Sequence, residues 1–98
     1  MEYQVVWAPS ALQDLEAVAA YVAKADPQRA DSIGEEIIQH VDVLRSFPRI
    51  GPVYERARDP RVHQVVCGSY RIFYRLREEQ RTVDILHVWH GARQDPAL

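Results

Sequence analysis

Three side chains in the second half of the chain could together hold or cleave an anionic group: Arg71, His90 and Arg93. Arg71 lies in the middle of one expected strand, while His90 ends the last expected strand and Arg93 follows it. We expect all three to converge at one edge of an open sheet. Two guanidinium groups and an imidazole suit a phosphodiester, with histidine carrying a proton and arginine stabilising the developing charge. They suit equally the carboxylates of a partner protein.

A purely structural role for these three side chains stays open. The arginines could form ion pairs within the chain, and the histidine could cap the end of a strand. The carboxylates available for such pairs are Asp84, Asp95 and Glu55. Under this interpretation the three side chains stabilise the fold and bind nothing.

The segment SYRIFYR, residues 69–75, has an unusual alternation for a strand. A half-buried strand normally alternates apolar residues with small or neutral polar ones. Here Arg71 and Arg75 share a face with Phe73, because alternate residues of a strand point the same way. We expect this mixed face to be the open side of the sheet.

The elements that must position these residues follow the order β-α-α-β-β-β. Residues 3–7 are expected to form a strand, and 53–61 a loop, with further strands at 62–67, 70–77 and 82–89. Two helices meet at Asp26-Pro27, a helix cap followed by a first-turn proline. Their apolar stripes are Leu12, Leu15, Val18, Ala19 and Val22, then Ala30, Ile33, Ile37, Val41 and Leu44. The pattern predicts one α+β domain over residues 1–98, an antiparallel sheet packed on an N-terminal helical hairpin.

The pairing of the last two strands decides which residues share a face. Symmetric pairing about residues 78–81 places Arg71 opposite Val88, Phe73 opposite Leu86, and Arg75 opposite Asp84. The helix side would then hold Tyr70, Ile72, Tyr74, Leu76, Val83, Ile85, His87 and Trp89. The other face would hold the arginines, His90 and an exposed groove lined by Phe73, Leu86 and Val88. A slip of one residue would exchange the two faces.

Charge is divided unevenly along the 98 residues. Residues 1–44 carry eight acids and two bases, whereas residues 45–98 carry six acids and ten bases, all of them arginine. Arginine offers a planar fork of donors suited to phosphate and carboxylate groups. The second half is therefore expected to bind the partner, and the acidic helices give no basic recognition helix for direct DNA binding.

Other kinds of site find little support. His87 and His90 are three residues apart in a strand and should point to opposite faces, so no metal site is expected. Cys67 and His63 would lie about 13 Å apart, too far for a thiolate–imidazole pair. Nucleophile-elbow and glycine-rich phosphate motifs are absent, so no cofactor is expected. Without a membrane-length apolar run, a signal-peptide pattern or a second cysteine, the expected compartment is the cytoplasm.

Several stretches of the chain together carry a family resemblance: YQVVWAPSALQDLEAVAAYVAKADPQRA, LRSFPRIGP, GSYRIFYR and TVDILHVWHGARQDP. From about residue 3 to 95 the chain resembles the RelE/ParE superfamily of toxins from type II toxin–antitoxin (plasmid stabilisation) pairs. The resemblance implies the β-α-α-β-β-β fold and a cognate antitoxin, whose C-terminal segment wraps the toxin with acidic and apolar side chains. The residues implied in binding antitoxin or target are Arg56, Arg58, Arg61, Arg71, Phe73, Arg75, His90 and Arg93.

Two activities compete within this superfamily. RelE-like members are metal-independent mRNA endonucleases that act on the ribosome, and the resemblance would give Arg71, His90 and Arg93 their catalytic roles. This chain lacks their lysines before the third strand and their late tyrosine, and its pI near 6.0 suits ribosomal RNA poorly. ParE-like members inhibit DNA gyrase without a catalytic set, and YRIFYR and HGAR resemble that branch more. We therefore favour a gyrase-directed toxin over an endonuclease, with a non-toxic binding module of a toxin–antitoxin repressor complex as a third possibility.

Overall fold

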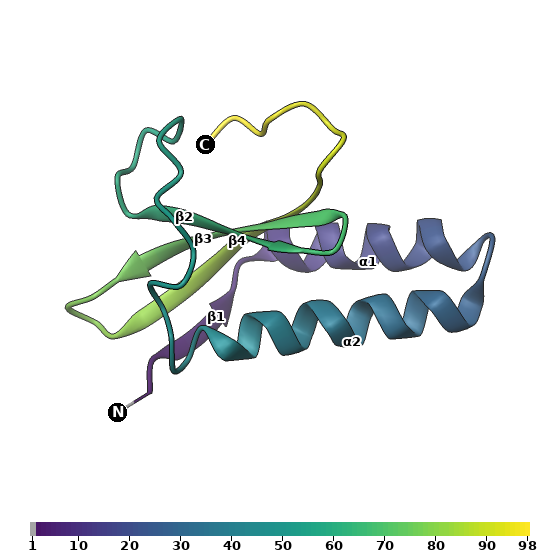
Figure 1. The fold of residues 1–98 in the computed structure, drawn as a ribbon, viewed down its shortest axis with the longest axis horizontal. Helices are drawn as coiled ribbons and strands as arrows, with labels where there is room; N and C mark the ends of the chain where they lie inside the picture. Colours follow the sequence, from purple (N-terminus) through teal and green to yellow (C-terminus); the bar gives the residue numbers. More distant parts are fainter. Residues whose placement is uncertain (1) are drawn as a thin grey trace.

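The expected order of elements is present in the computed structural model, which describes residues 2–98. The elements are β1 (Gln4–Trp7), α1 (Pro9–Ala23), α2 (Pro27–Val43), β2 (Val62–Cys67), β3 (Tyr70–Arg77) and β4 (Thr82–His90). The helical hairpin covers one face of a sheet with strand order β1-β4-β3-β2 (Figure 1). Strands β2, β3 and β4 form the predicted antiparallel meander, whereas β1 joins β4 in parallel, so the sheet is mixed and not wholly antiparallel.

Proline begins both helices, and aspartate caps α2 at the joint that the sequence predicted. Pro9 and Pro27 occupy the first turns of α1 and α2, where a missing backbone N–H costs little. The Asp26 side chain accepts a hydrogen bond from the backbone N–H of Arg29 at 3.1 Å, which caps α2. The short joint between the helices therefore returns the chain antiparallel to itself.

The apolar stripes of the two helices are buried to different degrees. In α1 only Ala11 is buried, and Leu12, a predicted core residue, is 47% exposed. Leu15, Val18 and Val22 are only partly buried, although they pack against the core cluster, so the α1 stripe lies at the edge of the core. The α2 stripe is buried as predicted, at Ala30, Ile33, Ile37 and Val41. Neither helix described within residues 2–98 has the length and hydropathy needed to cross a bilayer.

A β-bulge changes the predicted register halfway along the β3–β4 hairpin. Near the turn the pairing is as predicted, and Arg75 lies opposite Asp84. The register shifts between Phe73 and Tyr74, because β4 contains one extra residue there. Beyond the bulge every partner is displaced by one position. Arg71 consequently pairs with Trp89 and not with Val88.

The shift exchanges the faces of the residues near the end of β4. Val88 is buried in the core beneath the helices, although it was predicted on the opposite face. Trp89, predicted in that core, packs with the cluster around Phe73 on the other side. The predicted helix-side residues between the bulge and the hairpin turn are buried as expected: Tyr74, Leu76, Val83 and Ile85.

The sheet face away from the helices is covered, contrary to the prediction of an open side. A second cluster there consists of Tyr54, Val62 and Phe73, packed against Ala57, Leu86, Trp89 and Leu98. In Figure 1 the loop before β2 and the C-terminal segment both lie on this side of the sheet. Phe73 is completely buried, so the predicted exposed groove of Phe73, Leu86 and Val88 does not exist.

A buried turn at Gly51 fixes the loop before β2 against the sheet. The Tyr74 hydroxyl donates to the Pro48 carbonyl at 2.8 Å and accepts from the Gly51 N–H at 3.1 Å. His63 Nδ1 bonds to the Gly51 carbonyl at 2.7 Å. A Cβ atom at Gly51 would lie 2.3 Å from the Gln64 carbonyl oxygen, so only glycine fits at this close approach.

Candidate functional site

Arg71 is bound to a carboxylate from the C-terminal segment. Its Nη2 lies 2.8 Å from Asp95 Oδ1, and Arg56 Nη1 contacts the other carboxylate oxygen. The Arg71 side chain is only 18% exposed, and its guanidinium carbon lies 5.2 Å from the centre of the Phe73 ring. The ion pair that the sequence offered as a structural role for Arg71 is therefore confirmed, with Asp95 as the partner.

The side chains of Tyr54, Arg56 and Arg71, here called the cradle, surround the Asp95 carboxylate. The hydrogen bond from Arg71 is the main cause that lowers the pKa of Asp95, and the charges of both arginines add to it. The Tyr54 hydroxyl lies near enough to lower that pKa further, although it is outside good hydrogen-bond geometry. Two cations and a phenol around one carboxylate are the kind of set that binds an oxyanion.

Residues 94–98, here called the strap, cross the sheet face that holds the cradle. Trp89 Nε1 donates to the Gln94 carbonyl at 2.7 Å. The backbone N–H of Arg58 donates to the Leu98 backbone oxygen at 2.9 Å, and the Leu98 side chain packs against the second cluster. The strap is therefore held by an ion pair, backbone hydrogen bonds and an apolar contact.

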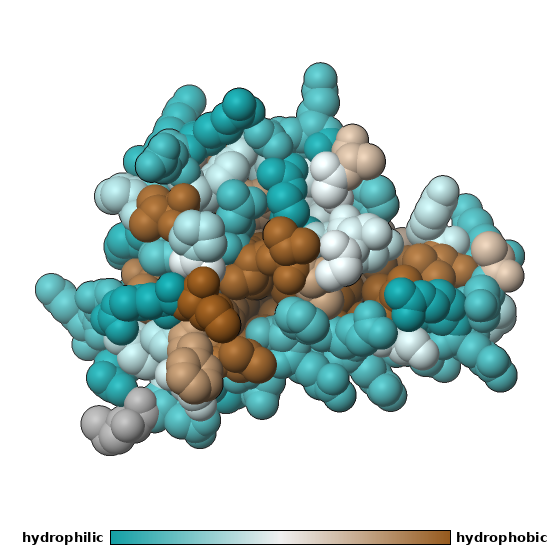
Figure 2. Space-filling model, in the orientation of Figure 1, coloured by the Kyte–Doolittle hydropathy of each residue, from teal (hydrophilic) through white to brown (hydrophobic). Residues whose placement is uncertain are grey.

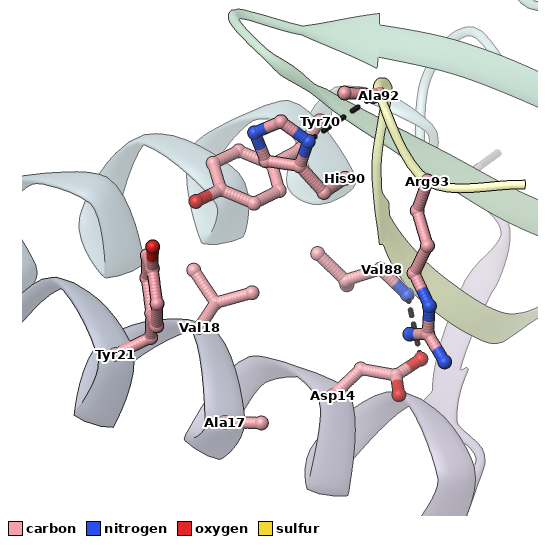
Figure 3. Close-up of a pocket in the computed structure, with 9 residues that line it drawn as sticks. All are labelled: Asp14, Ala17, Val18, Tyr21, Tyr70, Val88, His90, Ala92 and Arg93. Atoms are coloured by element: carbon pink, nitrogen blue, oxygen red, sulfur yellow. Dashed lines mark hydrogen bonds between the residues drawn. The ribbon is translucent and has the colours of Figure 1, made fainter.

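His90 lies on the other side of the sheet, and both His90 and Arg93 line a cavity beside α1 (Figure 3). The His90 ring centre is 5.3 Å from that of Tyr70, its partner across the hairpin. His90 Nδ1 accepts a hydrogen bond from the backbone N–H of Ala92 at 3.1 Å, so it caps the strand end as one alternative predicted. The Arg93 guanidinium carbon lies 3.7 Å from the centre of a Trp89 ring.

His90 and Arg93 help to line a cavity of about 560 Å³ between α1 and the ends of β3 and β4 (Figure 3). The remaining lining residues are Asp14, Ala17, Val18, Tyr21, Tyr70, Val88 and Ala92. The walls of the cavity are mostly apolar. The Asp14 carboxylate is engaged within the protein, because it accepts hydrogen bonds from His87 Nδ1 at 2.8 Å and from the Val88 N–H at 3.1 Å.

Arg71 and His90 do not converge, so the predicted site of Arg71, His90 and Arg93 is wrong as a geometric unit. Tyr70 pairs with His90 and Arg71 with Trp89, and neighbours along a strand point to opposite faces. The bulge is the cause, because it displaces His90 by one position from the predicted register. A histidine and an arginine acting on one phosphate would need to lie on the same face.

The other predicted arginines of this face form ion pairs near the opposite end of β3. Arg75 Nε lies 3.1 Å from Asp84 Oδ2, and Arg77 Nε shares that oxygen at 2.9 Å. Arg61 Nη2 lies 2.8 Å from Asp59 Oδ2, and its hydrogen bonds lower the pKa of Asp59 to about 2. A cavity of about 440 Å³ here is lined by Val6, Ala8, Arg61, Arg75, Arg77 and Asp84.

The eight predicted binding residues therefore divide into separate groups. Arg56 and Arg71 belong to the cradle, Arg61 and Arg75 to the cavity at the far end of β3, and His90 and Arg93 to the cavity beside α1. Phe73 is inaccessible to a partner because it is completely buried within the second cluster. Within residues 2–98 the side chains of Arg58 and Arg93 form no ion pair, and the Arg93 guanidinium instead stacks on Trp89.

Sequence reasoning missed Tyr54, Arg77 and Asp14. Tyr54 belongs to a segment assigned as polar loop, and an aromatic residue in such a segment was the one available signal of burial. Arg77 continues the alternation of Arg71 and Arg75 and could have been included on that basis. Asp14 lies 73 residues from His87 in sequence, and no local pattern indicates their contact.

Among residues 2–98, no three His, Cys, Asp or Glu side chains lie close enough together to bind a metal ion. Cys67 is buried, and burial raises the pKa of its thiol, which suppresses the reactive thiolate.

Comparison with known proteins gives the chain a family. Residues 5–95 match the family model described as the ParE toxin of the type II toxin–antitoxin system parDE. A curated relative from Sinorhizobium fredii (strain NBRC 101917 / NGR234), named "Putative toxin Y4kP", is 32% identical over 95 residues. That match covers 97% of this chain and 95% of the relative.

Solved structures share the fold. The chromosomal ParDE toxin–antitoxin system from P. aeruginosa superposes with a TM-score of 0.73 at 20% identity, covering 91% of this chain and 96% of the other. The toxin–antitoxin complex RelBE2 from Mycobacterium tuberculosis gives a TM-score of 0.66 at 26% identity, covering 92% and 99%. With the family match over nearly its whole length, the chain belongs to the ParE toxin family, within the RelE/ParE superfamily of type II toxin–antitoxin toxins.

Proposed function

We propose that this toxin arrests growth by binding DNA gyrase and that it does not cleave RNA. The observation that carries the proposal is the placement of Arg71 and His90 on opposite faces of the sheet. Acid–base cleavage of a phosphodiester needs a proton carrier within about 3 Å of the reacting oxygen, beside the groups that hold the phosphate. Arg71, bound to Asp95, and His90, bound to Ala92, cannot serve one phosphate in this arrangement. The match to the ParE family model adds support.

We propose further that a cognate antitoxin neutralises the toxin by covering apolar surface, giving a hetero-oligomer. The ParDE and RelBE2 neighbours are toxin–antitoxin assemblies. In this chain apolar side chains gather between α2 and the sheet (Figure 2), where Val43, Ile50 and Val66 help line a groove of about 720 Å³. Val66 is 66% exposed. An exposed apolar groove of this kind favours a protein partner.

A supercoiling assay tests the gyrase proposal. The purified protein should inhibit the supercoiling of relaxed plasmid DNA by gyrase, and addition of the antitoxin should restore it. In cells, induction of the toxin should reduce thymidine incorporation before amino-acid incorporation falls. Normal supercoiling at concentrations of toxin that arrest growth would rule the proposal out.

One observation favours a ribosome-dependent mRNA endonuclease as the second candidate. Tyr54, Arg56 and Arg71 converge on one carboxylate, and the same set could hold a phosphate in its place. This candidate predicts that mRNA is cleaved on translating ribosomes. At least one of the single substitutions Arg71→Ala and His90→Ala should abolish that cleavage. Intact transcripts during growth arrest would eliminate it. If induction of the protein does not arrest growth, both toxic activities are excluded, and the protein is the non-toxic binding module of a toxin–antitoxin repressor.

Both targets lie in the cytoplasm, which we propose as the compartment.

The acidic half of the chain forms both helices, with eight acids and two bases in residues 1–44. A helix of that charge is repelled by DNA phosphates. We therefore propose that the antitoxin, and not this chain, supplies any sequence-specific DNA contacts.

A further inference from the structure

A cavity at the far end of β3, away from the end that holds the cradle, gathers three arginine side chains. Its volume is about 440 Å³, and its lining residues are Val6, Ala8, Arg61, Arg75, Arg77 and Asp84. We propose that this cavity is a binding site for one phosphate group, carried by a free nucleotide or by the backbone of a nucleic acid. The inference goes beyond the proposed function, because it does not depend on the target of the toxin.

Two of the arginines share one buried carboxylate. Asp84 Oδ2 lies 3.1 Å from Arg75 Nε and 2.9 Å from Arg77 Nε, and Asp84 Oδ1 accepts from Arg77 Nη2 at 3.0 Å. One negative charge therefore faces two positive ones. The side chains of Arg75 and Arg77 are 35% and 34% exposed, so their charges are partly removed from water and yet open to a ligand. Charges removed from water need partners of opposite sign, which favours a second anion here.

The third arginine brings a carboxylate of its own. Arg61 Nη2 lies 2.8 Å from Asp59 Oδ2. The hydrogen bonds from Arg61 are the main cause of the low pKa of Asp59, and the charge of Arg75 lowers that pKa further, so the two ion-paired groups interact. Three arginines and two aspartates leave the cluster with one net positive charge. A phosphodiester, which carries a single negative charge, would neutralise it.

The hydrogen-bond donors that remain unused suit a ligand with more than two oxygen atoms. Arg75 donates to Asp84 through Nε, and Arg61 donates to Asp59 through Nε and Nη2. Among residues 2–98, no hydrogen bond involves either Nη atom of Arg75, or Nη1 of Arg61 or of Arg77. A carboxylate has two oxygens, and a single guanidinium fork binds both, as Arg61 does with Asp59. A phosphate group has three strong acceptor oxygens, enough for one bond from each arginine.

The arginines are held in place before a ligand binds. Arg75 and Arg77 alternate along β3, so both side chains stand on the same face of the sheet. The Arg61 carbonyl accepts from the Leu76 N–H at 3.0 Å, and the Arg61 N–H donates to Asp59 Oδ1 at 2.9 Å. Side chains that are already ordered lose less conformational entropy on binding. The cavity is therefore a preformed site.

Val6 and Ala8 supply the apolar part of the cavity wall. Val6 is 40% exposed beside Asp84, its partner in the parallel pairing of β1 and β4. A sugar or base attached to the phosphate would cover this surface, whereas inorganic phosphate would leave it in water. An organic phosphate should therefore bind more tightly than inorganic phosphate. Contacts to phosphate carry no sequence information, so the site would not distinguish one base sequence from another.

Titrations of the full-length protein with small anions test the site. The Nε–H signals of Arg75 and Arg77 in the ¹⁵N-labelled protein report binding while each probe is added at constant ionic strength. The phosphate probes are inorganic phosphate, thymidine monophosphate and a dithymidine dinucleotide joined by one phosphodiester. Acetate is the carboxylate probe.

Two substitutions remove arginines from the site. Arg61→Gln leaves both ion pairs of Asp84 intact, and the Arg61 side chain is 54% exposed, so this variant should fold as the parent does. Arg75→Gln removes a less exposed arginine. Arg45→Gln is the matched control, because Arg45 forms an exposed ion pair with Asp42 at 2.7 Å and does not line the cavity. Circular dichroism checks that each variant is folded.

The parent and Arg45→Gln should bind inorganic phosphate with equal affinity. Arg61→Gln should bind it about fivefold more weakly, and Arg75→Gln, followed through the Arg77 signal, about tenfold, because hydrogen bonds between charged groups strengthen away from water. At least one organic phosphate should bind more tightly than inorganic phosphate. Tighter binding of the dinucleotide than of the monophosphate would assign the site to a nucleic-acid backbone, and the reverse order would assign it to a free nucleotide.

Four results would overturn the proposal. The first is unchanged arginine signals with millimolar amounts of every phosphate probe, and the second is unchanged affinity in both Arg61→Gln and Arg75→Gln. The third is binding of acetate as tight as that of phosphate, which would indicate a carboxylate ligand. The fourth is tighter binding of inorganic phosphate than of both organic phosphates, which would leave an adventitious ion only. None of these measurements involves gyrase or RNA cleavage, so failure of the proposed function and failure of this inference are distinguishable.

Discussion

Replacing Tyr74 with phenylalanine removes a single oxygen atom from the centre of the fold. The side chain is completely buried, and its hydroxyl donates to the Pro48 carbonyl at 2.8 Å and accepts from the Gly51 N–H at 3.1 Å. Both partners belong to the turn that leads from α2 to the loop before β2. Because the aromatic ring keeps its place in Tyr74→Phe, the substitution isolates the contribution of the hydroxyl to that turn.

The expected loss of unfolding free energy is at least about 2 kcal/mol, from two hydrogen bonds and one buried group left unpaired, each taken at its smallest value. Each of the two hydrogen bonds contributes a net of roughly 0.5–1.5 kcal/mol. Their loss also leaves a buried N–H and a buried carbonyl without partners, at a cost of roughly 1–3 kcal/mol for each group that stays dry. For a domain of this size 1 kcal/mol corresponds to about 4–8 °C, so Tm should fall by at least about 8 °C.

Urea unfolding followed by circular dichroism measures the loss, and the midpoint should fall without a change in the m-value. Tyr21→Phe is the matched control, because Tyr21 is 76% exposed and its loss should stay within about 0.5 kcal/mol. A loss in Tyr74→Phe no larger than in this control would refute the reasoning. Burial also raises the pKa of Tyr74 above its ordinary value of 10.0. The parent should therefore lose stability as the pH rises above 10, where the unfolded phenol ionises first, and Tyr74→Phe should lose less.

Two glycines and one carboxylate give the remaining predictions. Gly51→Ala should lower the unfolding free energy by more than about 2 kcal/mol, because the new Cβ would lie 2.3 Å from the Gln64 carbonyl oxygen. Gly34→Ala should instead raise it by roughly 0.5–1 kcal/mol, since nothing lies within 4 Å of a Cβ at that helical position. Asp59, with a pKa of about 2, stabilises the fold above its ordinary pKa of 3.8, and this contribution is lost as the pH falls towards 2. Asp59→Asn should reduce the change of the urea midpoint with pH between pH 4 and 2. The same pH dependence in Asp59→Asn and in the parent would count against the pairing of Asp59 with Arg61.

The elements and most of the core could be predicted because they depend on residues close in sequence. The capping aspartate and proline at 26–27 and the α2 stripe are local patterns, and both are confirmed. The hairpin register near residues 78–81 is also local, and it was right as far as Tyr74. The parallel addition of β1 could not be predicted, because it pairs Gln4 with Thr82 across most of the chain.

The candidate site was predicted less well because it depends on one inserted residue. The stretch from Ile85 to His90 reads as an uninterrupted strand, and its alternation does not show that Leu86 is the bulged position. Asp95 was among the possible partners of Arg71, but the choice depends on how residues 94–98 cross the sheet. No local pattern encodes that path.

The same inserted residue explains why one small sheet presents two separate surfaces. It turns Val88 and His90 towards the helices, where they line the cavity beside α1, and it turns Trp89 to the opposite face, where the indole holds Gln94. Without it, Trp89 would face the helices, the strap would lose its first hydrogen bond, and His90 would share a face with Arg71. The separation of a proton carrier from the arginine cradle is therefore a property of the backbone and not of residue types. A protein with these same side chains and no bulge could bring both groups to one phosphate.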